Sequence, residues 1–151
     1  MSNLRLINET TATSVSSVDI TNVFSADFDI YKISVVGDFT NSNQIINARF
    51  INSSGSVVTA SNYDYAILSM ESGASFVEDR NTNQNYIRRM VYSNTGKDFG
   101  FVLYIFNPYS SSSYSFLLSQ GEGVPSGGGT SNKGISVLKQ TASMTGIQFY
   151  N

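Results

Sequence analysis

The feature that most constrains the fold is the length and spacing of the apolar segments. Apolar and polar residues alternate over short runs, and Ser, Asn or Gly interrupts the pattern each time. Alternation with a period of two is typical of half-buried β-strands, and no segment keeps the helical period of about 3.6 residues convincingly. Roughly nine or ten such segments predict an all-β sandwich or barrel, with residues 1–151 in a single domain.

The bounds of several segments can be estimated from the same pattern. Residues 27–39 predict the first long strand, in which a change of phase after Ile30 indicates a β-bulge. Residues 44–51 and the pair Val57-Val58 flank a Ser-Ser-Gly turn and predict a hairpin. Residues 62–70 fit either a strand or one helical turn.

Two further segments affect the architecture. Residues 99–106 are apolar on both faces, which predicts a central strand. Residues 121–134 (GEGVPSGGGTSNKG) are rich in Gly and predict a long flexible loop. The loop lacks the Lys that follows the last Gly of a phosphate-binding P-loop, and it is followed by a strand rather than a helix, so we expect no phosphate site there.

The composition excludes several classes of function. The chain has no Cys and no His, which removes disulfides, thiolate zinc sites and the commonest general base and metal ligand. The formal net charge is only −2, and no run of Lys or Arg is present. We therefore expect no cofactor, no metal, no nucleic-acid partner and no membrane span. The opening residues lack a secretory signal, which predicts synthesis in a cytoplasm without export by that route.

Two aspartates are the strongest candidates for catalysis or metal binding. Asp27 and Asp29 lie on the same side of the predicted strand, where paired carboxylates serve Ca²⁺ sites and glycoside hydrolases. Aspartates at the entry to a strand more often face water and protect a sheet edge. No nucleophile motif accompanies them, so we predict a protein without catalytic residues, and a hydrolase is the weakest alternative.

Tyrosines are the candidate binding residues, because a tyrosine combines a large contact area with a polar tip. The alternative for each is ordinary packing with the hydroxyl at the surface. The binding candidates are Tyr63, Tyr65, Tyr109 and Tyr114, of which Tyr109 stands on a serine-rich turn beside Pro108.

The order of segments resembles a small β-domain of tailed bacteriophages of the marine cyanophage type. The closest segment is GFVLYIFNPYSSSSYSFLLSQG, an apolar strand that enters an Asn-Pro turn and a strand ending in Gln. INARFINSSGSVVTASNYDYA and TASMTGIQFY are similar to other parts of that domain. The resemblance implies a jelly-roll-like antiparallel β-sandwich of about eight to ten strands, exposed on a virion as an oligomer or attached to a larger scaffold.

The last strand predicts where such an assembly forms. The family typically continues into a further strand after the segment that resembles residues 146–150, whereas this sequence stops at Asn151. An exposed sheet edge presents unpaired N–H and C=O groups and is open to strand addition. We therefore expect Ile147, Phe149 and Tyr150 to lie at an assembly edge beside another chain.

These inferences lead to two functional hypotheses. The first is a non-enzymatic virion structural protein, either a capsid decoration protein or a short fibre component, whose partners are copies of itself and other virion proteins. The second is the binding module of a tail fibre, which recognises a host receptor or surface glycan through turns such as residues 107–114. Both place the protein in the virion after synthesis in the host cytoplasm.

Overall fold

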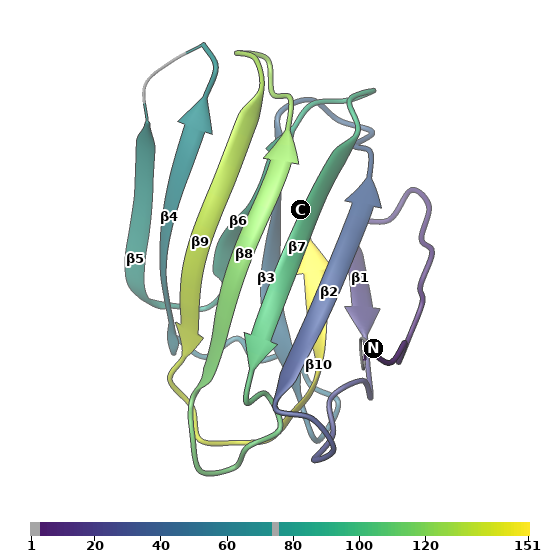
Figure 1. Ribbon diagram of the computed structural model, residues 1–151, viewed down its shortest axis with the longest axis vertical. Coiled ribbons are helices and arrows are strands. Elements are labelled where there is room, and N and C mark those ends of the chain that lie inside the picture. Colours follow the sequence, from purple (N-terminus) through teal and green to yellow (C-terminus); the bar gives the residue numbers. More distant parts are fainter. Residues whose placement is uncertain (1–3, 74–75) are drawn as a thin grey trace.

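The computed structural model describes residues 4–73 and 76–151. Within these ranges the chain forms ten β-strands and no helix, which confirms the all-β prediction (Figure 1). No helix that is long and apolar enough to span a membrane is therefore found in the part of the chain described. The strands are β1 (Ser17–Ile20), β2 (Ile30–Gly37), β3 (Gln44–Asn52), β4 (Tyr63–Glu71), β5 (Val77–Gln84), β6 (Ile87–Ser93), β7 (Phe99–Phe106), β8 (Ser115–Gly123), β9 (Thr130–Leu138) and β10 (Met144–Tyr150).

The strands form two antiparallel sheets packed face to face. The four-stranded sheet has the order β1-β10-β3-β6, and the six-stranded sheet, which faces the viewer in Figure 1, has the order β2-β7-β8-β9-β4-β5. If the hairpin β8–β9 were removed, the strand order of the larger sheet would be β2-β7-β4-β5. Together with the smaller sheet, that is the strand order of an eight-stranded jelly roll. The fold is thus a jelly-roll sandwich whose larger sheet is widened by one inserted hairpin, as the predicted fold class required.

Several local predictions differ from the structure or are decided by it. The Gly-rich segment 121–134 is not one long loop, because β8 continues to Gly123 and β9 begins at Thr130. The predicted bulge in residues 27–39 is absent from β2, which pairs with β7 without a register shift from Ile30 to Gly37. The ambiguous segment 62–70 is the strand β4. The polar strand β5 was not foreseen, because its sequence VEDRNTNQ shows no apolar alternation.

The expectation of an open edge at the last strand is also wrong. β10 lies inside the four-stranded sheet, where Ile147 pairs with Ile20 of β1 on one side and with Phe50 of β3 on the other. Ile147 and Phe149 are buried in the core, and Tyr150 is half-buried. In a jelly roll the first and last strands are neighbours, so the groups that looked unpaired bond to β1. An interchain contact at these residues stays a prediction, but β10 is paired on both sides and has no open edge to support it.

The core differs between the two halves of the sandwich. Beneath β2 and β7 it is filled by aromatic rings, such as Phe101 against Phe149 with 5.3 Å between ring centroids. Beneath β8 the sheets nearly touch. A Cβ added at Gly121 or Gly123 would collide with the backbone carbonyl of Met90 or Tyr92 on β6. Only glycine permits so close an approach of two backbones.

Candidate functional site

Two of the four predicted binding tyrosines are structural. Tyr63 and Tyr65 lie on β4 and are 0% and 4% exposed, so they cannot offer a ring to a ligand at the surface. The Tyr63 hydroxyl donates a hydrogen bond to the Val58 carbonyl and accepts one from the Phe50 N–H, at 3.1 and 3.0 Å. Burial raises the pKa of Tyr63 well above its usual range. The binding role expected of these two residues is therefore replaced by a packing role.

The other two tyrosines are at the surface. Tyr109 and Tyr114 are 37% and 44% exposed on the connection between β7 and β8. The connection is held against the start of β10: the Met144 N–H donates to the Pro108 carbonyl, and the Ser143 hydroxyl donates to the Tyr109 carbonyl, both at 2.8 Å. These two hydrogen bonds fix the turn in place. The role of Tyr109 and Tyr114 in binding stays a prediction.

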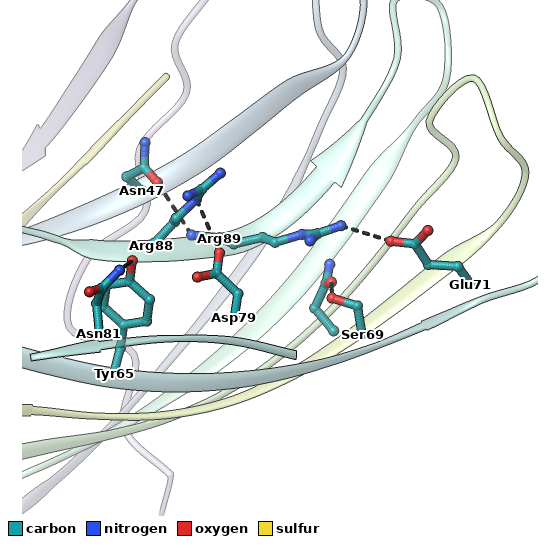
Figure 2. Close-up of polar contacts among 9 residues, drawn as sticks. Asn47, Tyr65, Ser69, Glu71, Asp79, Asn81, Arg88 and Arg89 are labelled. Atoms are coloured by element: carbon teal, nitrogen blue, oxygen red, sulfur yellow. Dashed lines mark hydrogen bonds and ion pairs between the residues drawn. The ribbon is translucent and has the colours of Figure 1, made fainter. Parts of the chain in front are cut away.

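The charged residues between the two sheets are matched one to one. Figure 2 shows Arg89 of β6 reaching Glu71 of β4 at 3.0 Å, while the neighbouring Arg88 reaches Asp79 of β5 at 3.3 Å. Asn132 accepts a hydrogen bond from Ser69 close by, at 2.6 Å. No group of three or more acidic, His or Cys residues that could hold a metal occurs among the described residues. These side chains hold β4, β5 and β6 together.

The inserted hairpin β8–β9 is inverted relative to an ordinary sandwich strand pair. Eight of its ten inward positions carry small or polar residues, and several of its outward positions carry large apolar ones. The small or polar inward residues are Ser115, Ser119, Gly121, Gly123, Thr130, Asn132, Gly134 and Ser136, the two apolar inward residues are Leu117 and Leu138, and the outward apolar residues are Phe116, Leu118, Ile135 and Val137. The sheets lie too close together at Gly121 and Gly123 for larger side chains. Leu117 and Leu138 still point into the core, but the other four large apolar side chains of this hairpin face away from it.

The outward residues join those of the neighbouring strands into two apolar rows. In the first row the register places Ile30, Phe106, Phe116 and Val137 side by side across four strands. In the second row Tyr104, Leu118, Ile135 and Ala66 are side by side, with Lys32 at one end and Arg80 at the other. We call these two rows the apolar face. Among them Ile135 is 62% exposed, Ile30 59% and Phe116 46%.

The apolar face is hollowed. A shallow, open depression of about 820 Å³ lies over its β8, β9 and β4 part, with Phe116, Leu118 and Ile135 in its lining and Arg80 at its rim. A second depression of about 810 Å³ lies at the opposite end of the same sheet and is lined by Val36, Met70 and Phe76, among others. Gln120 and Lys133, on the outward row between them, separate the two. The larger sheet thus offers a concave apolar surface to a partner.

Only an indirect signal for this surface is present in the sequence. The expectation that residues 99–106 are apolar on both faces and lie centrally agrees with β7, which pairs with β2 on one side and β8 on the other. In β8 and β9 Leu117 and Leu138 point into the core whereas Phe116 and Ile135 point outward, a division that apolar alternation alone does not predict. The signal present in the sequence is the pair of glycines at alternate positions, Gly121 and Gly123, which marks the face on which another backbone approaches.

Comparison with known proteins provides no identification. No protein-family model matches the chain, and neither a curated protein nor a solved structure matches it. The fold and the apolar face are therefore the basis on which a function is assigned.

Proposed function

We propose that this chain is a non-catalytic structural protein that assembles with other protein chains through the apolar face of its six-stranded sheet. In the setting implied by its sequence resemblance, it is a virion protein of a tailed bacteriophage, a capsid decoration protein or a short fibre component. It is made in the host cytoplasm, and its partners are other copies of itself and other virion proteins.

The observation that carries the proposal is the inverted hairpin β8–β9. Soluble monomers rarely expose a large contiguous apolar patch, and such patches mark interaction sites. Here Phe116, Leu118, Ile135 and Val137 point outward on adjacent strands, while most of the inward positions carry small or polar residues. Burying Ile135 and Phe116 against a partner would contribute roughly 1.5–3 kcal/mol for each fully buried side chain.

The chemistry of the apolar face favours a protein partner over a sugar. Sugar recognition combines aromatic rings with several convergent polar groups. The two rows consist mainly of aliphatic residues and contain a single tyrosine, Tyr104, beneath the Lys32 ammonium group at 5.9 Å from the ring centroid. Aliphatic rows with a few charged residues at the rim fit the core-and-rim pattern of protein interfaces.

The use of the charged groups supports a non-catalytic role. Arg88, Arg89 and Lys139 each lie against one carboxylate, at 3.3, 3.0 and 2.8 Å. The first two pairs link β6 to the opposite sheet, and the third links the end of β9 to β4. The tyrosine with the strongest shift, Tyr63, is buried and has a raised pKa, so it holds its proton at neutral pH. These groups hold the sandwich together: Glu71 lines one depression and Asp64 the other, and each is paired with a cation.

The test is a charge placed in the centre of the apolar face. Ile135→Lys should leave the free energy of unfolding within about 0.5 kcal/mol of the original, because the side chain is 62% exposed. It should weaken self-association or capsid binding at least about tenfold, since a buried lysine loses its hydration. Gln148→Lys, on the outer face of the other sheet, is the matched control. Equal association of both variants, measured by size-exclusion chromatography with light scattering and by binding to purified capsids, would exclude this face.

A receptor- or glycan-binding function is the second candidate, and the exposed pair Tyr109 and Tyr114 favours it. Both stand on one connection, which two hydrogen bonds fix to the start of β10. Binding to a host surface glycan on an array, lost in Tyr109→Ala but kept in Ile135→Lys, would assign recognition to this turn. Binding that survives Tyr109→Ala would remove it.

A further inference from the structure

The N-terminal segment, residues 4–15, has no partner in its own domain. Every residue of this segment is exposed, including Leu4 at 79%, Leu6 at 78% and Ile7 at 46%. Among the described residues, none of residues 4–15 donates or accepts a hydrogen bond outside the segment. In Figure 1 the segment loops out along the side of the molecule where β1 and β2 lie. We call it the arm.

The sheet edges of the domain are protected in three places and unprotected in one. β1 is only four residues long, β5 carries Glu78, Asp79 and Arg80 with a register shift, and β6 carries two arginines with a register shift. Short length, charges and bulges are the devices that prevent edge pairing. β2 (IYKISVVG) has eight residues, one charge and no register shift. It is a long, regular and mostly apolar edge, and its inward residues Ile33 and Val35 are only half-buried.

We propose that the arm of one copy adds as an antiparallel strand to the β2 edge of a second copy. Residues 4–15 span about 40 Å when extended, and β2 spans about 26 Å, so the arm covers the edge and leaves a short linker. The addition would satisfy the free N–H and C=O groups of β2 and widen the six-stranded sheet by one strand. Arm addition uses the β2 edge of the six-stranded sheet rather than the apolar face. It therefore rests on the proposed function only in assuming that copies of the chain assemble.

One register satisfies both the apolar and the charged residues. Leu6 opposite Val35 covers the half-buried side of the edge, and the same antiparallel register then places Glu9 opposite Lys32. Directly opposite residues in neighbouring strands have their side chains on the same face, where an apolar pair and an opposite-charge pair are both favourable. Ile7 then lies opposite Ser34 and extends the outer side of the sheet.

The direction of the chain favours a second copy over the arm's own domain. The arm is tied to the start of β1, because the Asn151 N–H donates to the Ser16 carbonyl at 3.2 Å. β1 and β2 run in opposite directions in Figure 1, so an arm folded back onto its own β2 would lie parallel to it. All strand pairs in both sheets are antiparallel, and parallel pairing is less stable for each residue. Only an arm from another copy pairs antiparallel without a reversal.

The test uses the natural absence of cysteine from the chain. The single variants Ile7→Cys and Ser34→Cys are mixed and oxidised, so that a disulfide between positions 7 and 34 must join two chains. The control mixture pairs Ile7→Cys with Thr82→Cys on the opposite edge, β5. All three side chains are at exposed positions. Non-reducing electrophoresis with peptide mass analysis should give the 7–34 link in clear excess over the 7–82 link.

A charge exchange tests the register. Glu9→Lys and Lys32→Glu should each lower the yield of the 7–34 link about threefold, and mixing chains that carry the two reversals should restore it. No restoration would reject this register, and no excess of the 7–34 link would reject arm addition as a whole.

The outcome is separable from that of the proposed function. If the 7–34 link shows no excess while Ile135→Lys still abolishes association, arm addition is wrong and assembly through the apolar face stands. If the link is in excess and Ile135→Lys has no effect on association, arm addition stands and the apolar face is not the interface. If the 7–34 link shows no excess and Ile135→Lys has no effect on association, both proposals fail. At protein concentrations too low for association, deletion of residues 4–15 should leave the unfolding midpoint unchanged, because the arm makes no hydrogen bond to its own domain.

Discussion

On the outer face of the four-stranded sheet polar side chains bind one another, whereas on the outer face of the six-stranded sheet large apolar side chains are exposed. The first face is polar and joined across strands. Gln148 donates to Asp19 at 2.9 Å, and the Arg49 guanidinium lies 4.4 Å from the centroid of the Tyr150 ring and donates to the Asn85 carbonyl at 2.9 Å. The second face exposes rows of aliphatic and aromatic side chains. A face that satisfies its own groups contributes to folding, and a face that does not is available for assembly.

The largest expected effect comes from separating the two sheets that carry these faces. Gly121→Ala places a methyl group against the Met90 carbonyl of β6, where the backbone cannot move aside. We expect a loss of about 3 kcal/mol in the free energy of unfolding, measured by urea denaturation. Gly100→Ala is the matched control, because its added Cβ would meet the Val35 carbonyl oxygen at an ordinary 3.6 Å. Equal stability of both variants would contradict the close approach of β8 and β6.

The next prediction compares the stability effect of a substitution on the outer face of the four-stranded sheet with that of a substitution at the rim of the apolar face. Arg49→Ala removes a cation–π contact and a hydrogen bond on the four-stranded sheet, and should lower the free energy of unfolding by about 1–2 kcal/mol without changing association. Arg80→Ala, at the rim of the apolar face, should change stability by less than about 0.5 kcal/mol. Thermal unfolding and light scattering of both variants give the two readouts. A stability loss in Arg80→Ala as large as in Arg49→Ala would remove the distinction.

A smaller effect concerns Asp64 of β4, which pairs with Val137 at the end of the first apolar row. The hydrogen bond from the Lys139 ammonium, at 2.8 Å, and the Asn83 N–H hold the pKa of Asp64 below its usual range. Because the pKa is lower in the folded state, the pair stabilises the fold above the unfolded pKa of about 4, and this contribution is lost as the pH falls through the folded value. Asp64→Asn should therefore reduce the drop in melting temperature between neutral and acidic pH. An unchanged drop would mean that the pair does not contribute.

The smallest effect is expected from salt. Association through aliphatic rows depends on apolar burial, which added salt does not screen, whereas exposed ion pairs weaken as the ionic strength rises. Between about 0.1 and 1 M sodium chloride the dissociation constant should change by less than about twofold. Strong weakening by salt would shift the interface from the apolar rows to the charged rim.

Much of the candidate site could not be predicted, for two physical reasons. Tyr63 looked like a binding residue because an alternating tyrosine has the same pattern on either face of a sheet. The tertiary structure places its ring inside, with its hydroxyl between β3 and the Val58 carbonyl. Phe116 and Ile135 received no role, because nothing local reveals that the opposite sheet is too close to accept them. The exposed positions of Tyr109 and Tyr114 could be anticipated from the serine-rich turn that carries them.

The sequence by itself determined the type of structure. A period of two over short segments fixes strands, turn residues fix most of their ends, and the lack of Cys and His limits the chemistry of the chain. Tertiary structure decided which side of each strand is the inside. The glycines of β8 let β6 approach so closely that the hairpin turns Phe116 and Ile135 outward, and β1 closes the edge that β10 was expected to leave open. Alternation defines two faces of a strand, but only the packing of a second sheet determines which of them is buried.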